Sequence, residues 1–293
     1  MRNLRKMVQS PTRLILMEAH NGITAKLVEE AGFEAIWASG LTISASLGLR
    51  DCNEASWTQV VDVLEYMADA VDIPILLDGD TGYGNFNSVR RLVTKLEQRG
   101  VAGVCLEDKI FPKTNSFIDR GQKLASIEEF TGKIKAAKDT QRNSGFTVVA
   151  RVEALIAGLG MEEALKRAHA YLDAGADAIL MHSKKPDARE IMSFLQEWNR
   201  AGPVVVVPTT YPRVSLIGLG ELGASNAIYA NHTLRTTITA LRLALGDLAA
   251  GESLATLEET IVPVKDIFAL QNDEELRLAE SRYLPVEGEG NED

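Results

Sequence analysis

Carboxylates follow short apolar runs at two neighbouring places in the sequence. Asp78 and Asp80 come after one run, and Glu107 comes after the next. Carboxylates that lie together repel one another unless a cation or protons intervene. Oxygen ligands without a paired His or Cys suit a hard ion such as Mg2+, which keeps several of its waters. We therefore predict a Mg2+ site at Asp78, Asp80 and Glu107. The alternative is that the aspartates shape the turn 79–84 and that Glu107 pairs with a lysine.

Two nitrogen-bearing side chains take the same place after later apolar runs. Arg151 follows Val148–Val149, and His182 follows Ile179–Met181. A guanidinium in so apolar a run needs an anionic partner, and it binds carboxylate or phosphate with two N–H groups. We predict that both residues bind an anion. The alternatives are a structural ion pair of Arg151 with a neighbouring glutamate and a hydrogen-bonded core histidine.

One long connection, 109–125, interrupts otherwise regular spacing. It contains Lys113 and Asn115, and also Ser116, Asp119 and Arg120. Loops longer than about 12–15 residues in compact domains are often lids that exclude water during a reaction. A lid with Lys and Asn would close over an anionic group, whereas the alternative is a solvated surface loop.

These residues need a scaffold that brings strand ends together. Runs rich in Val, Ile and Leu alternate with helical stretches, a pattern typical of βα units around a parallel sheet. Glycines recur before the runs, at 32, 100, 175 and 223, where a left-handed residue ends a helix. We predict a (β/α)8 barrel, whose site lies at the C-terminal strand ends. Its expected strands are Leu14–Glu18, Glu34–Ser39, Pro74–Asp78, Gly103–Asp108, Thr147–Glu153, Ala178–Ser183, Val204–Pro208 and Ala227–Asn231.

The chain continues beyond the barrel. We predict a catalytic barrel over 1–250, a helical extension over 251–285 and a disordered acidic tail over 286–293. The apolar residues of the extension need a partner surface, and a neighbouring subunit is one solution.

Composition excludes several classes of protein. The 293 residues carry 31 Lys and Arg against 41 Asp and Glu, a net charge of −10. Nucleic-acid binding needs clustered basic residues, and anionic membranes repel an acidic protein. No stretch approaches the ~20 apolar residues of a membrane span. We expect a cytoplasmic protein with a small-molecule substrate, no nucleic-acid partner and no membrane partner.

Several longer motifs resemble the phosphoenolpyruvate mutase branch of the isocitrate lyase superfamily. The similarity covers nearly the whole chain. The matching stretches are 17–22 (MEAHNG), 37–41 (WASGL), 50–59 (RDCNEASWTQ), 77–87 (LDGDTGYGNFN), 107–116 (EDKIFPKTNS), 151–154 (RVEA), 180–185 (LMHSKK), 230–232 (ANH) and 283–285 (YLP).

The resemblance implies roles for individual residues. Asp78 would bind Mg2+, with Asp80 and Glu107 holding its waters. The substrate carboxylate would meet Trp37, Ser39, Gly40 and Leu41, while Arg151 and His182 would bind its other anionic groups. Asp51 matches a carboxylate that attacks or guides the phosphoryl group; without the resemblance it reads as a carboxylate at a helix N-terminus. Lys113 and Asn115 would complete the catalytic set.

The lid sequence discriminates between relatives. Lyases of the superfamily carry a catalytic Cys in this loop, and Lys113-Thr-Asn-Ser116 has none. Phosphonopyruvate hydrolases have Thr at the position of Asn115. The resemblance therefore favours interconversion of phosphoenolpyruvate and phosphonopyruvate, with phosphonopyruvate hydrolysis as the alternative. Gly79 stands where mutases often have Ala.

The resemblance also implies partners. C-terminal helices would be swapped between subunits of a homotetramer built as a dimer of dimers. A phosphonopyruvate decarboxylase would remove the product, because the equilibrium lies far toward phosphoenolpyruvate.

Overall fold

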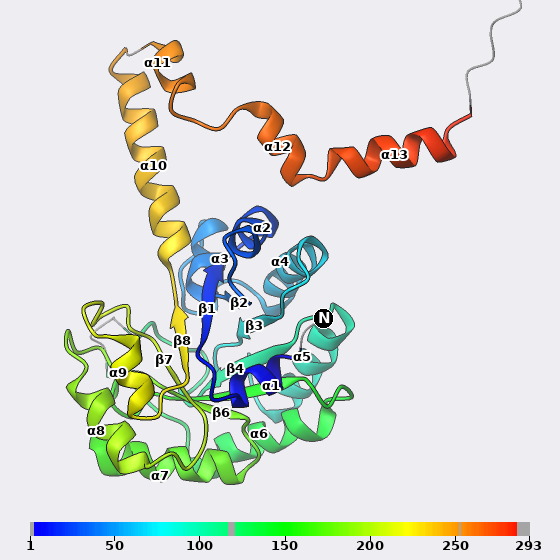
Figure 1. Ribbon diagram of the computed structural model, residues 1–293. Coiled ribbons are helices and arrows are strands. Elements are labelled where there is room, and N and C mark those ends of the chain that lie inside the picture. Colours follow the sequence, from blue (N-terminus) through cyan, green and yellow to red (C-terminus); the bar gives the residue numbers. More distant parts are fainter. Residues whose placement is uncertain (1–2, 117–120, 252, 286–293) are drawn as a thin grey trace, which may run out of the picture. The chain divides into compact units, whose positions relative to one another are not determined.

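The chain folds around a closed barrel of eight parallel strands. In the computed structural model, which describes residues 3–116, 121–251 and 253–285, each strand pairs with the next (Figure 1). Leu14 lies opposite Asn226, which joins the eighth strand to the first. The (β/α)8 prediction is confirmed, and every expected strand overlaps an observed one. The strands are β1 (Leu14–Ala19), β2 (Ala35–Ala38), β3 (Ile75–Asp78), β4 (Gly103–Glu107), β5 (Thr147–Val152), β6 (Ala178–Met181), β7 (Val204–Val206) and β8 (Asn226–Tyr229).

Helices occupy the connections between the strands, and one further helix, α1 (Leu4–Gln9), precedes β1. Glycines 32, 100, 175 and 223 all have positive φ angles directly after helices, as predicted. The helices of this part are α1 (Leu4–Gln9), α2 (Gly22–Glu30), α3 (Gly40–Ser46), α4 (Trp57–Ala70), α5 (Phe86–Gln98), α6 (Ile127–Thr140), α7 (Gly160–Asp173), α8 (Arg189–Trp198) and α9 (Leu216–Glu221), and α10 (His232–Ala249) follows β8.

Two apolar cores lie on the two faces of the strands. Successive side chains of a strand point to opposite faces. Inward residues such as Leu76 and Val149 form one buried cluster, whereas their outward neighbours pack under the helices. Leu4 and Val8 of α1 join the inner cluster, and Asn226 Nδ2 donates to the Val8 carbonyl at 2.9 Å. Helix α1 therefore closes the barrel at the end where the strands begin.

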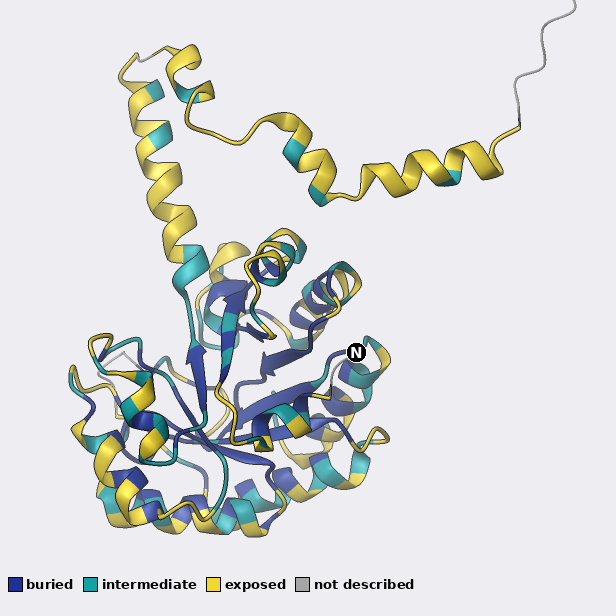
Figure 2. Ribbon diagram, viewed as in Figure 1, coloured by how far each residue is buried: buried dark blue, intermediate teal, exposed yellow. Residues whose placement is uncertain are grey.

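The chain divides into two compact units, 1–235 and 236–293. The second unit contains most of α10, then α11 (Leu254–Glu258), α12 (Val264–Leu270) and α13 (Asp273–Tyr283). None of its described residues is buried (Figure 2). The expected acidic tail, 286–293, lies outside the described residues, and the predicted boundary at 250 stays a prediction. No helix in the described part of the chain combines the length and apolarity needed to cross a membrane.

Gly79 lies where β3 and β4 approach too closely for a side chain. A Cβ at this position would lie 2.4 Å from Val104 Cγ2 and 3.1 Å from the Cys105 carbonyl oxygen. The Gly79 N–H donates to that carbonyl at 2.8 Å, so the backbone cannot withdraw without losing a hydrogen bond. Position 79 therefore has no room for a side chain as long as residue 104 is valine.

Gly79→Ala should lower the free energy of unfolding by about 1–3 kcal/mol, the usual cost of overpacking a core. Because Val104 is the main obstacle, Val104→Ala should offset part of this loss in the double variant. Urea unfolding of the four proteins measures the coupling. Gly132→Ala, in open space on α6, is the control and should not destabilise. Full stability of Gly79→Ala would contradict the packing account.

Candidate active site

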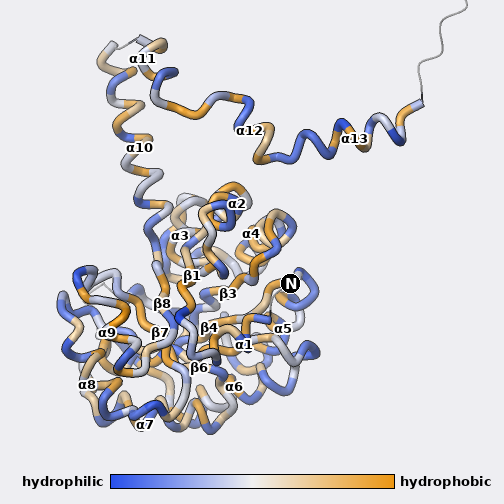
Figure 3. Tube along the Cα trace, viewed as in Figure 1, coloured by the Kyte–Doolittle hydropathy of each residue, from blue (hydrophilic) through white to orange (hydrophobic). Residues whose placement is uncertain are grey.

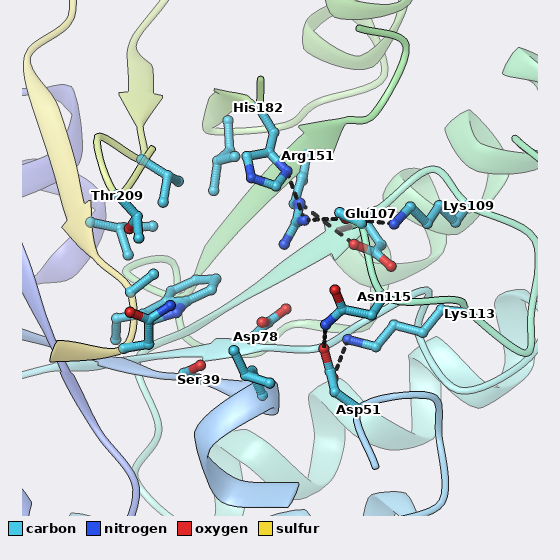
Figure 4. Close-up of a pocket in the computed structure, with 18 of the residues that line it drawn as sticks. Ser39, Asp51, Asp78, Glu107, Lys109, Lys113, Asn115, Arg151, His182 and Thr209 are labelled. Atoms are coloured by element: carbon cyan, nitrogen blue, oxygen red, sulfur yellow. Dashed lines mark hydrogen bonds and ion pairs between the residues drawn. The ribbon is translucent and has the colours of Figure 1, made fainter. Parts of the chain in front are cut away.

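A cavity lies at the C-terminal ends of the barrel strands (Figure 4). Ten of the twelve predicted site residues line it, and the other two, Gly40 and Asp80, lie directly beside lining residues. A Cβ at Gly40 would lie 3.5 Å from the Asp78 carboxylate, and Lys113 Nζ lies 2.5 Å from Asp80 Oδ1. The ten are Trp37, Ser39, Leu41, Asp51, Asp78, Glu107, Lys113, Asn115, Arg151 and His182.

Strand alternation explains why these residues meet. Each of the five strands β2 to β6 supplies an apolar residue to the inner core and, two positions later, a polar residue at the mouth of the barrel. The pairs are Trp37 and Ser39, Leu76 and Asp78, Cys105 and Glu107, Val149 and Arg151, and Leu180 and His182.

The predicted metal carboxylates are buried and close to one another. Burial raises the pKa of Asp80 to about 7; Lys113 opposes this increase, and the charges of Asp78 and Glu107 reinforce it. Asp80 has a left-handed backbone (φ 50°), and Asn53 Nδ2 donates to its Oδ2 at 2.8 Å. A non-glycine residue held in this conformation is common at functional sites. The cluster carries more negative charge than its surroundings neutralise.

The donor set fits a hard cation that keeps part of its water shell. Glu107 Oε1 is buried and has no hydrogen-bond partner among the described residues. Within those same residues, no three His, Cys, Asp or Glu side chains converge to form a metal site by themselves. Mg2+ needs no such cage, because waters and substrate oxygens complete its octahedron. Asp78, Asp80 and Glu107 could therefore hold Mg2+, directly or through water.

Asp51 is fixed by two residues of the lid segment. Lys113 Nζ lies 2.7 Å from Asp51 Oδ1, and Asn115 Nδ2 donates to Asp51 Oδ2 at 2.6 Å. Burial would raise the pKa of Asp51, but Lys113 and Asn115 hold it below its usual range. Ser56, not Asp51, caps the next helix, α4, so the helix-terminus interpretation of Asp51 does not hold. Asp51 is an ionised carboxylate that faces the cavity.

Arg151 forms internal ion pairs and also faces the cavity. Its Nε lies 2.5 Å from Glu153 Oε1 and 3.5 Å from Glu107 Oε2. Its Nη2 lies 2.9 Å from His182 Nδ1. Burial and the charge of Arg151 lower the pKa of His182, so the imidazole is neutral at pH 7. Arg151 therefore forms a structural ion pair and also lines the cavity, so the two interpretations of this residue do not exclude each other. Asp119 and Arg120 of the lid lie outside the described residues.

Nine further residues line the cavity without having been predicted as site residues. Four are apolar (Leu180, Val207, Ile228 and Ala230), and five are polar (Lys109, Thr114, Ser116, Thr209 and Asn231). The Thr209 hydroxyl is buried and has no hydrogen-bond partner within the described chain. Val205 faces inward, so alternation carried past β7 through 207 would have identified Thr209. The other polar residues depend on the path of the lid and of the β8 end, which spacing alone does not determine.

Comparison with known proteins agrees with this geometry. The family model described as phosphoenolpyruvate phosphomutase matches residues 4–249. The chain is 56% identical to a phosphoenolpyruvate phosphomutase of Tetrahymena pyriformis, over 96% of this chain and 94% of the relative. It matches the crystal structure of a phosphoenolpyruvate phosphomutase from Streptomyces platensis subsp. rosaceus with a TM-score of 0.93 and 46% identity, covering 97% and 99% of the two chains.

A second solved structure, phosphonopyruvate hydrolase in complex with oxalate and Mg2+, matches with a TM-score of 0.91 and 39% identity, covering 97% and 98% of the two chains. The fold, the cavity and the extent of these similarities lead to one conclusion: the chain belongs to the phosphoenolpyruvate phosphomutase family.

Proposed function

We propose that this protein interconverts phosphoenolpyruvate and phosphonopyruvate by moving a phosphoryl group between the enolate oxygen and the C3 carbon of one substrate. The observation that carries this proposal is the arrangement of Asp51. Figure 4 shows Asp51, Lys113 and Asn115 together on one side of the cavity and Arg151 with His182 on another. A phosphoryl group between them would meet Asp51 with Lys113 and Asn115 on one side and Arg151 with His182 on the other.

The pyruvyl part of the substrate would lie toward β2 and β3. Ser39 and Leu41 line the cavity where α3 begins, and Trp37 lies one inward position deeper. Backbone N–H groups at this turn, with Gly40, suit a carboxylate. The reacting enolate is then held in one orientation, which replaces a bimolecular encounter by a positioned transfer.

The migrating phosphoryl group would be held by Arg151, His182, Lys113 and Asn115. A loose, metaphosphate-like transfer needs positioning and charge stabilisation more than covalent chemistry. Asp51 either accepts the group or keeps it aligned, and both roles use the same ionised carboxylate. The lid segment keeps water from the phosphorus, because attack by water would give pyruvate and phosphate.

We further propose that Mg2+ is the cofactor, with Asp78 as a direct ligand and Asp80 and Glu107 holding its waters. When bound, the ion stabilises the enolate charge. The buried, unpartnered Glu107 Oε1 and the raised pKa of Asp80 support this assignment. The related hydrolase was solved with Mg2+ and oxalate.

Phosphonopyruvate hydrolysis is the second candidate function, because the solved hydrolase is almost as similar in fold as the solved mutase. The contact of Asn115 with Asp51 favours the mutase. An amide at this place donates a hydrogen bond to the guiding carboxylate, and it fills space that a shorter threonine would leave to water.

We propose that the second unit packs on another copy of the chain, with swapped helices in a homotetramer. Hydrophobic positions recur along α10 to α13 (Figure 3). Several apolar residues of these helices are exposed, among them Leu241, Leu245 and Phe268. The barrel unit offers an apolar groove lined by Met17, Phe33, Pro208, Pro212, Val214, Leu216, Tyr229 and His232. Exposed apolar surface of this extent is typical of subunit interfaces.

The cytoplasm is the proposed location. Cys52 and Cys105 are both free thiols, which fits a reducing compartment. A decarboxylase acting on phosphonopyruvate is the proposed pathway partner, because the product must be removed for net synthesis.

Incubation with phosphonopyruvate and Mg2+ tests the function. We expect phosphoenolpyruvate to be the main phosphorus-containing product when the reaction is monitored by 31P NMR. Asp51→Asn keeps the shape of the side chain but removes its charge, and it should lower turnover by about 100-fold or more. Stoichiometric inorganic phosphate from the wild type would instead establish the hydrolase.

Exhaustive chelation tests the cofactor. Activity should disappear and return on addition of Mg2+, because the excess of buried carboxylates then regains its counter-ion. Asp78→Asn should bind Mg2+ more weakly in calorimetry while the protein stays folded. Full turnover after chelation would exclude the metal role.

Leu241→Glu combined with Leu245→Glu tests the assembly. The two residues are four apart on α10 and so share one face. Charges on this face should reduce the mass measured by light scattering, whereas Met192→Glu, an exposed apolar position on α8, should not. A wild-type monomer at micromolar concentration would rule out the proposal.

A further inference from the structure

Glu153 is a fully buried carboxylate directly behind the predicted anion-binding pair. It follows β5, two positions after Arg151, and none of its surface is exposed. Its backbone N–H donates to Asp108 Oδ1 at 2.9 Å, which fixes the main chain at this point. Burial alone would raise the pKa of Glu153, but Arg151, His182 and Lys109 hold it well below its usual range. The side chain is therefore a charged acceptor without contact to solvent.

One carboxylate oxygen of Glu153 serves the anion-binding pair. Oε1 accepts a hydrogen bond from Arg151 Nε at 2.5 Å and lies 2.8 Å from His182 Nδ1. Contacts of the guanidinium and the imidazole with the same oxygen fix these two planar groups relative to each other. Arg151 Nη2 in turn donates to Ser116 Oγ at 3.0 Å and lies 2.9 Å from His182 Nδ1, and both residues line the cavity.

The other oxygen serves the lid segment. Oε2 accepts a hydrogen bond from Ser116 Oγ at 2.8 Å and lies 3.1 Å from Lys109 Nζ. Lys109 is buried, and Glu153 is its one ion-pair partner within the described chain. Lys109 Nζ also donates to Ser116 Oγ at 2.6 Å and to the Thr114 carbonyl at 3.0 Å, so it joins the start of the lid segment to residues 114–116.

The two oxygens of the rigid Glu153 carboxylate contact different partners, so a movement at one oxygen affects the contacts of the other. Movement of Ser116 and Lys109 away from the cavity removes both partners of Oε2 and leaves an under-compensated buried charge. Buried charges that lose a partner are strongly destabilised, so the carboxylate must shift. Such a shift also moves the acceptor on which Arg151 and His182 depend.

We propose that Glu153 is a positioning residue that couples the lid segment to Arg151 and His182, so that the phosphoryl-binding pair reaches its working geometry only when water is excluded. This inference rests on the proposed function and assigns to Glu153 control over the fate of the phosphoryl group. With the coupling intact, the group moves within the substrate. Without it, water attacks phosphorus, the C–P bond breaks, C3 takes a proton, and the products are pyruvate and inorganic phosphate.

Glu153→Gln tests the coupling. The amide keeps one acceptor and places an NH2 group against the partners of the other oxygen, so one half of the linkage is lost. We expect turnover of phosphonopyruvate to fall about 100-fold, as for a misplacement of about 1 Å, and the ratio of inorganic phosphate to phosphoenolpyruvate to rise at least tenfold. The ratio is measured by 31P NMR at equal conversion.

Asp177→Asn is the matched control. Asp177 is also a buried carboxylate with an arginine and a lysine, since Arg5 Nε and Lys138 Nζ lie 2.8 and 2.9 Å from it, but it precedes β6 at the opposite end of the barrel. A general loss of stability should appear in both variants. A change in product ratio should appear only in Glu153→Gln.

Lys109→Met tests the same coupling from the lid segment, because it removes the ion pair of Lys109 with Glu153 and keeps the contacts of Glu153 with Arg151 and His182. It should raise the same product ratio. The double variant Glu153→Gln/Lys109→Met removes both charges together and should recover stability lost by Glu153→Gln, while the ratio stays raised. It keeps the test valid if the single variant folds poorly.

The outcomes separate the two proposals. A wild type that forms only inorganic phosphate overturns the mutase assignment itself. A wild type that forms phosphoenolpyruvate, with unchanged product ratios in Glu153→Gln, Lys109→Met and the double variant, overturns the role of Glu153 and leaves the function intact.

Discussion

The alternation of side chains along parallel strands is the constraint on which this molecule depends. In a closed barrel all inward positions at one height face the same small volume, and those beyond the last apolar layer face its mouth. Eight short strands thereby bring residues as distant in sequence as Ser39 and Asn231 to one cavity. Apolar side chains fill the barrel below this polar layer, and α1 covers the other end. The polar side chains therefore face the mouth of the barrel.

Such convergence concentrates charge in a place with little water. Each buried charge is costly unless it is paired, so the site is built as a network in which cations lie between carboxylates. With every carboxylate ionised and His182 neutral, five carboxylates would face three cationic side chains and leave two negative charges, and the pKa values of Asp80 and Glu107 are raised accordingly. The groups are Asp51, Asp78, Asp80, Glu107 and Glu153, with Lys109, Lys113 and Arg151. The proposed Mg2+ would balance this excess and prepare the site for an anionic substrate. The net charge of −10 on the whole chain therefore does not oppose a small anion, because screening restricts its influence to about 8 Å.

Much of this was accessible from the sequence, for a physical reason. Apolar strand runs and helix-ending glycines can be recognised locally in the sequence. Because the C-terminal ends of all barrel strands lie at the same mouth, most of the predicted site residues line the cavity. Lys109 and Glu153 illustrate what was not accessible. Their pairing joins a lid segment to a strand end, and nothing in their spacing indicates which of several charged residues will meet. Thr209 was missed although alternation past β7 indicates it.

The barrel is shared by mutase and hydrolase, so the residues that distinguish the two activities are to be sought in the contacts of the lid segment. The chain superposes on solved examples of both with TM-scores of 0.93 and 0.91, so the barrel itself cannot decide whether water reaches the phosphorus. The decision must lie in the few contacts that close the site. Two of them meet in the lid segment: Asn115 against Asp51, and Ser116 with Lys109 against Glu153. In the proposed mechanism, the first contact shields the carboxylate of Asp51 and the second aligns Arg151 and His182. On the proposed mechanism, a substitution in either contact therefore changes the products while the fold and the carboxylates proposed to hold Mg2+ stay the same.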